Sequence, residues 1–353
     1  MQNSNFIKAL LQEDVSHTPI WLMRQAGRYM PEYRELRKKA GSFLNLCKNP
    51  ELATKVTLQP INAFDLDAAI LFSDILVIPE ALGMELYFVE NEGPKFKHSI
   101  TNEADLSQLT LDGLEAKLDY VFQTITNLQS ELKGKIPLIG FSGSPFTLLC
   151  YMIEGGSSKD FSKTKEFLYT KADLCHKILE MLSIAVTRYL HKQITSGINT
   201  YMIFDTWGGI LSSHSYSEFS LNYIDKIIKN LNKDFAKFPS IVFTKGGGVH
   251  LDKIAKINPH AIGLDWTIDI ANARKILPQS TLQGNLDPNI LAYGDRDVIK
   301  KEVTQIINDH YLANSHSINK HIFNLGHGIL QTTPMDNVKY LVDLVHELSS
   351  KLK

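Results

Sequence analysis

Short apolar runs alternate along the chain with segments of helical periodicity. Eight of the apolar runs have the length of buried strands and are bounded by polar or turn-forming residues. The predicted strands are residues 20–23, 68–72, 136–141, 200–204, 240–244, 261–264, 281–283 and 322–324.

Amphipathic helices are predicted between these strands. In the segment EAKLDYVFQTITNLQSEL, five apolar residues form a single stripe, namely Leu118, Val121, Phe122, Ile125 and Leu128. A second helix carries its apolar stripe from Leu174 to Leu190 and is expected to end near Gly197. A final helix is marked by Leu341, Leu344 and Val345.

The repeated strand–helix order predicts parallel strands, and eight such units predict a single (β/α)8 barrel, the TIM-barrel architecture. One insertion, ELYFVENEGPKFKHSI, has the pattern of a β-hairpin with residues 91–94 at its turn. No low-complexity linker or change of composition divides the chain. We therefore expect one domain over residues 1–353, with residues 1–17 as an N-terminal extension.

Composition narrows the class of protein. The chain has 353 residues, 44% of them hydrophobic, so it can bury a large core. Its net charge of -1 gives no global attraction for nucleic acid or an anionic membrane. The three cysteines are widely spaced and odd in number, which favours reduced thiols. No segment approaches the length of a membrane span, so we expect a soluble, cytoplasmic protein.

The residues that directly follow the predicted strands should meet at the C-terminal rim, where barrels of this kind build their sites. Small residues, polar groups and single charges recur there. In chain order the segments are MRQAGRY, SD, SGSPFTLLCYMIEGGSSKDF, DTWGG, KGGG, DWT, GNLDP and LGHG.

The first of these segments carries two arginines, Arg24 and Arg28, on either side of Gly27. Gly27 and the following Pro31 disfavour a continuous helix, so a loop at the end of a strand is predicted. A guanidinium group stays charged and binds carboxylates through paired hydrogen bonds. The alternative is a solvated surface pair with little energetic effect.

Seven segments resemble the uroporphyrinogen decarboxylase family in order, from about residue 18 to 345. They are MRQAGRY, FSDIL, GFSGSPFTL, YMIEGG, GLDWT, QGNLDP and NLGHG. The resemblance implies a homodimeric (β/α)8 barrel that acts in haem and other tetrapyrrole biosynthesis. It implies a carboxy-lyase that converts the four acetate arms of uroporphyrinogen to methyl groups, giving coproporphyrinogen, without metal or organic cofactor.

The resemblance also assigns site residues. Asp74 is expected to stabilise a cationic intermediate, while Arg24 and Arg28 bind carboxylates and are candidates, with water and a substrate carboxylic acid, for proton delivery. The expected substrate contacts are Arg24, Gln25, Ala26, Gly27, Arg28, Phe43, Asp74, Tyr151, Thr206 and His327. Thr206 stands where the family usually has serine, and it keeps the hydroxyl group.

Most of these residues also have a structural interpretation. Asp74 follows a strand, where aspartate often caps a helix, and Tyr151 stands among apolar residues, as a core tyrosine would. Thr206 has the position of a turn hydroxyl, Phe43 that of an ordinary packing residue, and His327 is a lone histidine.

Other motifs predict ordinary architecture. Lys245 and the three glycines after it lack the order of a phosphate-binding loop and are interpreted as a turn. Asp265 and Asp287 are interpreted as parts of the rim. No H-x-H or H-E-x-x-H motif occurs, so a hydrolytic zinc is not expected.

Two other functions compete with the decarboxylase. A corrinoid-dependent methyltransferase of the same fold holds zinc with a His-x-Cys pair and a later cysteine, but here Asp252 stands two positions after His250 and no cysteine follows Cys175. A catalytically silent tetrapyrrole carrier would bind the macrocycle without releasing carbon dioxide. Intact Arg24, Arg28 and Asp74 argue against the carrier.

Overall fold

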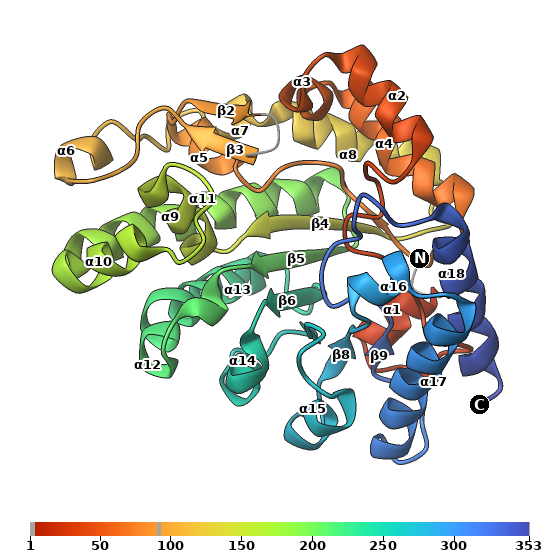
Figure 1. Cartoon of the computed structure of the whole chain (residues 1–353). Coiled ribbons are helices and arrows are strands. Elements are labelled where there is room, and N and C mark those ends of the chain that lie inside the picture. The colour runs from red at the N-terminus through yellow and green to blue at the C-terminus, as the bar shows by residue number, and fades with distance from the viewer. Residues whose placement is uncertain (1–3, 90–92, 353) are drawn as a thin grey trace.

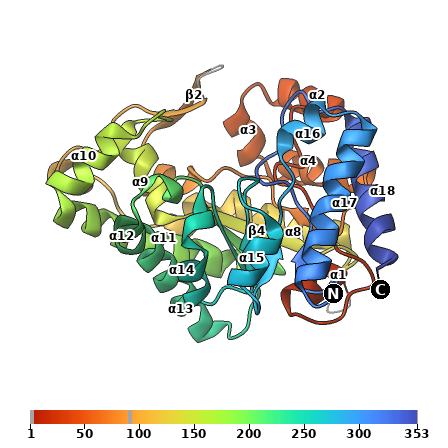
Figure 2. The same ribbon diagram turned by 60° about the horizontal axis from the view of Figure 1, so that its bottom comes forward.

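A computed structural model describes residues 4–89 and 93–352 of the chain. Seven parallel strands form one curled sheet in the order β1-β4-β5-β6-β7-β8-β9, with helices around it (Figures 1 and 2). The strands are β1 Ala69–Ile70, β4 Leu138–Gly143, β5 Thr200–Asp205, β6 Ser240–Thr244, β7 Ala261–Gly263, β8 Thr281–Gln283 and β9 His321–Ile322. The predicted α/β class with parallel strands is confirmed.

The first predicted strand, residues 20–23, is not a strand in the structure. Ile20 makes a single parallel bridge with Phe323. Trp21 N still donates to the backbone, to Phe323 O at 3.4 Å. The next two amides bond to side chains, because Leu22 N donates to Gln25 Oε1 at 3.1 Å and Met23 N to Asn324 Oδ1 at 3.0 Å. A regular strand needs these donors for its ladder, so no eighth strand forms and the sheet has seven strands instead of the predicted eight.

The segment that contains Ile20 nevertheless lies between the two edges of the sheet. Phe323 N donates to Pro19 O at 2.8 Å, and Asp67 N donates to Ile20 O at 2.9 Å. We call residues 18–23 the seam segment. It places the loop that carries Arg24 beside both β9 and β1.

The helices surround the sheet and cover its outer face (Figure 1). They are α1 Asn5–Leu10, α2 Pro31–Ala40, α3 Phe43–Lys48, α4 Pro50–Ala63, α5 Val77–Leu82, α6 Glu103–Leu106, α7 Leu114–Lys117, α8 Asp119–Leu132, α9 Pro145–Glu154, α10 Ser162–Thr170, α11 Ala172–Ser196, α12 Ser213–Ser215, α13 Asn222–Asp234, α14 Leu251–Lys256, α15 Ile270–Ile276, α16 Pro288–Tyr293, α17 Arg296–Ala313 and α18 Met335–Ser350. Short 3-10 turns occupy Gly208–Ile210 and Gly247–His250, and a π-helical turn occupies Tyr216–Leu221.

The helix predictions agree with this arrangement except in detail. The segment predicted as one helix over residues 115–132 is divided into α7 and α8, with Leu118 between them. The predicted long helix is α11, and Gly197 follows it with a φ of 118°, a conformation that glycine adopts without strain. The predicted final helix is α18.

The predicted hairpin is the antiparallel pair β2 Leu86–Val89 and β3 Gly93–Phe96. Pro94 pairs with Phe88 and so belongs to the strand, not to the turn. The other predicted turn residues include Asn91 and Glu92, which lie outside the described residues.

Two hydrophobic clusters form the interior. The larger joins β4 to β8 with the apolar faces of α8, α9, α11 and α13. The smaller joins the seam segment to α4, α17 and α18. The N-terminal residues belong to the larger cluster, because α1 buries Phe6 and Leu10 there, and Ala9 O accepts a hydrogen bond from Thr281 Oγ1 at 2.7 Å. Among the described helices, none is both long and apolar enough to cross a lipid bilayer.

Candidate active site

The two arginines of the first rim segment lie on a loop, as predicted. Residues 24–30 form no helix, and Pro31 is the first residue of α2. The left-handed residue is Arg24, with a φ of 62°, whereas Gly27 has a φ outside the left-handed region. The left-handed conformation in this loop therefore belongs to Arg24 and not to the glycine.

Gln25 is the buried anchor of this loop. Its side-chain oxygen accepts from Leu22 N at 3.1 Å, and its amide nitrogen donates to Ala68 O at 3.2 Å. Gln25 is 1% exposed. These bonds fix the loop to β1 and leave Arg24 and Arg28 exposed on either side of it.

Asp74 lies four residues after β1, on the loop that leads into α5. Its Oδ1 accepts from Leu76 N at 2.7 Å, but α5 begins at Val77 without a side-chain cap, so Asp74 does not cap that helix. Burial raises the pKa of Asp74 to about 6, although the Leu76 amide and the positive charge of Arg24 both act to lower it. Since burial destabilises the charged form of this carboxyl group, a cationic or hydrogen-bond-donating ligand would stabilise it strongly.

Arg24 is the centre of the arrangement. Its charge acts on Asp74, on the Tyr151 hydroxyl and on His327. Gly328 packs directly against it, since a Cβ atom at that position would stand 2.4 Å from Arg24 Cδ. The glycines on either side of His327 admit protein atoms, because a Cβ on Gly326 would stand 2.3 Å from Trp266 N.

Aromatic side chains line the same rim. Tyr151, on α9, lies beside Trp207 with ring centroids 6.3 Å apart, and burial raises the pKa of its hydroxyl. Phe43 lies at the start of α3. Its ring centroid is 5.9 Å from that of Phe72 and 4.9 Å from that of Phe88 in the hairpin. Phe72 stands two residues before Asp74, so Phe43 packs close to the strand end that carries the aspartate.

His327 follows β9 and is half-buried. Burial and, to a smaller extent, the charges of Arg24 and Lys245 lower its pKa to about 4 against the opposing effect of Asp265. The imidazole is therefore neutral at pH 7. A neutral ring binds a carboxylate by donating one hydrogen bond, while the neighbouring cations supply the charge.

Lys245 is the residue that the sequence interpretation missed. It directly follows β6, and its Nζ lies 5.7 Å from the Trp207 ring centroid and 6.0 Å from that of Trp266. The charge of Lys245 lowers the pKa of His327, as the charge of Arg24 does, so both cations lie close to the same imidazole. Its position immediately after a strand indicated a place on the rim. The interpretation of KGGG as a turn assigned no role to the lysine itself.

Three cations of this rim lack an anionic partner. Within residues 4–89 and 93–352, Arg24, Arg28 and Lys245 make neither a side-chain hydrogen bond nor an ion pair with a carboxylate. Arg28 is exposed and lies near enough to Tyr33 to act on its hydroxyl group. Unpaired cations at one edge of a neutral protein form a local site for an anionic ligand.

The other rim aspartates are structural, as the sequence interpretation expected. Asp265 accepts hydrogen bonds from Gly246 N and from Thr267 N. Asp287 caps α16 by accepting from Asn289 N at 2.8 Å. A further buried carboxylate, Asp205, accepts from Ser144 Oγ at 2.6 Å and Ser220 Oγ at 2.9 Å, and it holds the ends of β4 and β5 together.

Thr206 and Ala26 complete the predicted set. Thr206 directly follows β5 and is half-buried, and its hydroxyl makes no hydrogen bond within the described part of the chain. Ala26 is half-buried in the arginine loop and packs against the smaller hydrophobic cluster. The structure thus brings strand ends β1, β5, β6 and β9 together with the arginine loop and α9.

The zinc set of a corrinoid methyltransferase is not assembled among the described residues. Cys47, Cys150 and Cys175 are free and buried, and burial raises the pKa of Cys175 to about 12. His250 stacks on Tyr216 with ring centroids 4.2 Å apart. A group of three residues able to hold a metal occurs in the described chain at the opposite end of the sheet, and it contains no cysteine.

Comparisons with known proteins agree with this geometry. The family model "Uroporphyrinogen decarboxylase (URO-D)" matches residues 1–348. A uroporphyrinogen decarboxylase of Neisseria meningitidis strain FAM18 is 53% identical over 352 residues, which cover 99% of this chain and 98% of the relative. One from Janthinobacterium sp. strain Marseille is 51% identical over 356 residues, covering 100% of this chain and 98% of the relative.

A solved structure shares the fold at much lower identity. A methyltransferase from Methanosarcina mazei superimposes with a TM-score of 0.81, covers 97% of each chain and is 20% identical. At that identity the likeness concerns the fold alone. The family match and the two relatives span nearly the whole length of the sequence, and the chain belongs to the uroporphyrinogen decarboxylase family.

Proposed function

We propose that this protein is a carboxy-lyase that decarboxylates the four acetate arms of uroporphyrinogen to methyl groups, giving coproporphyrinogen in haem biosynthesis. Family membership supports the reaction. The observation that carries the assignment of the site is the position of Asp74, a carboxylate with a raised pKa close to Arg24, on a rim with three unpaired cations. A polyacid with a ring of N–H donors fits both features.

The substrate supplies the electron sink. Protonation of a pyrrole ring carbon gives an iminium-like cation, and the electron pair left by departing carbon dioxide returns to that ring. No metal or organic cofactor is required in this scheme. Asp74 accepts hydrogen bonds from pyrrole N–H groups and stabilises the transient positive charge. A unit pair at roughly 4 Å with an effective dielectric near 20 gives about 4 kcal/mol, or about three decades of rate.

The remaining residues bind the arms. Arg24, Arg28 and Lys245 pair with acetate and propionate carboxylates, and the neutral His327 donates one hydrogen bond. The hydroxyl groups of Tyr151 and Thr206 contact further arms, and Phe43 covers one face of the macrocycle. Gln25 and Gly27 act by fixing the arginine loop. The proton comes from an arginine, from water or from a substrate carboxylic acid.

The direct test is incubation of the purified protein with uroporphyrinogen III under reducing conditions. We expect release of four equivalents of carbon dioxide and accumulation of coproporphyrinogen, measured by chromatography after oxidation. A tetrapyrrole carrier would bind the macrocycle and release none. Binding without carbon dioxide from freshly reduced substrate would therefore overturn the proposal in favour of the carrier.

We also infer the closure of the barrel, the single domain and the oligomeric state from the family. The seam segment closes the seven-stranded sheet into a barrel in the place of an eighth strand, and residues 1–353 form one domain. Two copies of the chain associate as a homodimer in the cytoplasm. Sedimentation equilibrium tests the dimer, since a protein that stays at 39.8 kDa at micromolar concentration would contradict it.

A further inference from the structure

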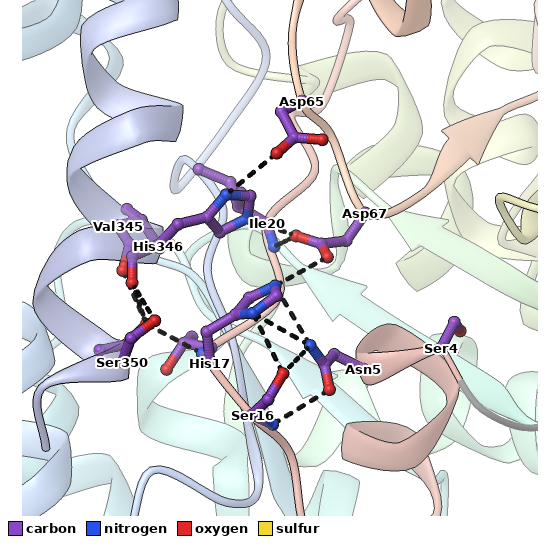
Figure 3. A network of polar contacts seen from close by, with 12 residues as sticks. Ser4, Asn5, Ser16, His17, Ile20, Asp65, Asp67, Val345, His346 and Ser350 are labelled. Carbon is purple, nitrogen blue, oxygen red and sulfur yellow. Dashed lines mark hydrogen bonds and ion pairs between the residues drawn. The ribbon is translucent and has the colours of Figure 1, made fainter. Parts of the chain in front are cut away.

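Three segments that are distant in sequence meet at the end of the sheet opposite the active site. His17 precedes the seam segment, Asp67 precedes β1, and His346 lies in the last turns of α18 (Figure 3). His17 Nε2 lies 3.1 Å from Asp67 Oδ1, and His346 Nε2 lies 2.8 Å from Asp67 Oδ2. The ring centroids of the two histidines are 4.4 Å apart.

The two imidazoles have the same orientation relative to this centre. Each points Nε2 toward Asp67 and Nδ1 toward a second polar partner. His17 Nδ1 lies 3.3 Å from Ser16 Oγ, and His346 Nδ1 lies 3.7 Å from Asp65 Oδ2 (Figure 3). The amide nitrogen of Asn5 also lies beside His17, 3.1 Å from Nδ1 and 3.2 Å from Nε2, and it must turn away when Nε2 binds an ion. Metal-binding histidines characteristically use one ring nitrogen for the ion and donate the other N–H to a carboxylate or hydroxyl group, which fixes the ring.

The carboxylate is also held in place. Asp67 Oδ2 accepts from Ile20 N at 2.8 Å, so a backbone amide of the seam segment orients it. One ligand atom from each of the three residues lies within 4.8 Å of the others. Ligands bound to zinc at about 2.0–2.1 Å in a tetrahedral site stand roughly 3.4 Å apart, so only small side-chain shifts would bring all three to bonding distance.

We propose that His17, Asp67 and His346 form a structural site for a divalent transition metal of the zinc class. Two imidazole nitrogens and one carboxylate oxygen are ligands that zinc prefers, and water completes the tetrahedron. Each ring binds the ion through Nε2 as a neutral imidazole whose single proton is on Nδ1, on the side of Ser16 or Asp65, and a ring that carries two protons releases its Nε2 proton to solvent. The side chains are 25%, 15% and 18% exposed, so an ion can enter without unfolding.

The site would bridge the N-terminal segment, the entrance to β1 and the C-terminal helix. It is separate from the catalytic rim, because Asp67 and Asp74 stand before and after the same strand. The expected effect is on stability and not on chemistry, and the cofactor-free decarboxylation proposed above does not depend on it.

The chain offers a matched control. Glu218 also faces two imidazoles, with His176 Nε2 at 3.3 Å and His214 Nε2 at 3.5 Å. His214 is 91% exposed there, and this group does not converge on a common point as the proposed site does. A His214→Gln variant therefore removes a histidine near a carboxylate without touching the proposed site.

The test is titration of chelator-treated protein with Zn²⁺ by calorimetry, and with Co²⁺ by visible absorption, which reports tetrahedral coordination. We expect one equivalent of Zn²⁺ bound by the wild type and by His214→Gln. His346→Gln and His17→Gln should each weaken binding at least tenfold, and Zn²⁺ should raise the Tm of the wild type but not of His346→Gln. Circular dichroism checks that both variants fold.

The contrary results are equally specific. Failure of the wild type to bind Zn²⁺ or Co²⁺ at micromolar concentration would leave the cluster as a hydrogen-bonded network and overturn the proposal. Equal binding by His346→Gln, or loss of binding in His214→Gln, would place the metal elsewhere and overturn it too. Decarboxylase activity is measured separately, so failure here does not affect the proposed function.

Discussion

Two aspartates lie at opposite ends of the short strand β1. The environment of one lowers the pKa of its carboxyl group, and the environment of the other raises it. Asp67, before the strand, is buried, which raises its pKa, but hydrogen bonds from His17 and His346 outweigh burial and hold its pKa below the ordinary value. Asp74, after the strand, accepts a single hydrogen bond within the described part of the chain, from Leu76 N, and burial raises its pKa to about 6.

The difference shows how one strand serves two purposes. The charge of Asp67 is satisfied within the protein and therefore contributes to folding. The charge of Asp74 is left under-satisfied, which costs stability and leaves the carboxylate ready for an external partner. Perturbed ionisable groups of the second kind are typical of functional sites. The comparison can be tested by removing each charge in turn.

The largest effect is expected for Asp74→Asn. The substitution removes the charge that stabilises the cationic ring, so kcat/KM should fall by about three decades. The folded protein should at the same time become more stable. The pKa of Asp74 is raised from 3.8 to about 6, so ionisation costs up to about 3 kcal/mol above pH 6. Steady-state kinetics and urea unfolding at pH 7 measure both changes.

The surface variant Asp343→Asn is the control for Asp74→Asn, since its carboxylate pairs with the exposed Lys339 on α18. It should leave kinetics and stability close to the wild type. A near-normal rate in Asp74→Asn would exclude the electrostatic role of the aspartate. A loss of stability in that variant would show that the charge is satisfied in the free protein, and the contrast with Asp67 would disappear.

The next effect concerns the arginine loop. Arg28→Lys keeps the positive charge but loses the planar pair of donors, so the affinity for the macrocycle should fall roughly tenfold or more. Binding is measured by fluorescence titration with coproporphyrin, and KM is expected to rise more than kcat falls. Unchanged affinity would show that Arg28 does not bind a carboxylate as a fork.

A smaller effect is expected for Gly328→Ala. The new Cβ would stand 2.4 Å from Arg24 Cδ, so the Arg24 side chain must shift from its position. We expect kcat/KM to fall roughly tenfold, since a misplacement of about 1 Å is costly in an organised site. In the control, Gly248→Ala, the added Cβ would meet Ile268 at 3.4 Å, an ordinary contact. Equal activity in both variants would mean that the position of Arg24 is not critical.

The smallest effect is a change of stability at the other end of β1. Asp67→Asn in metal-free protein should lower the free energy of unfolding by about 1–2 kcal/mol near pH 6, because it removes hydrogen bonds between charged groups. The folded pKa of Asp67 is lowered, so its contribution is present above pH 3.8 and is lost as the pH falls through that lowered pKa.

The pH window of this effect follows from both partners. The pKa of His346 is raised, because its hydrogen bond to Asp67 outweighs burial, which acts to lower it. Its contribution is therefore complete below pH 6.5 and is lost as the pH rises through the raised pKa. Unfolding measured from pH 4 to pH 9 should show the destabilisation of Asp67→Asn shrinking at high pH. A constant difference across that range would contradict the pairing.

The sequence predicted most of the strands because their interior faces are continuously apolar. Strands β6 and β8 agree residue for residue with the predicted runs, and the pattern also located α11 and α18. The seam segment was mispredicted because hydrophobicity reports burial and not the identity of the hydrogen-bond acceptor. Side-chain oxygens of Gln25 and Asn324 replace the ladder there, and no period in the sequence reveals that.

The sequence indicated which residues the candidate site contains but not their geometry. Strand ends indicated Asp74, Thr206 and His327, since parallel strands finish at one rim. Lys245 stood in the same kind of position, yet its glycine neighbours suggested only a turn. The group of His17, Asp67 and His346 had no sequence signal, because Asp67 and His346 are 279 residues apart and only the fold brings them together.

The bonds of the seam segment have a consequence for synthesis of the chain. Met23 N needs Asn324, and Thr18 N donates to Ser349 Oγ at 3.0 Å, so both partners are made about 300 residues after the donors. A ribosome releases the N-terminal end first. The arginine loop can therefore reach its final conformation only after almost the whole chain has left the ribosome. A chain that ends early would lack the bonds that hold this loop in place.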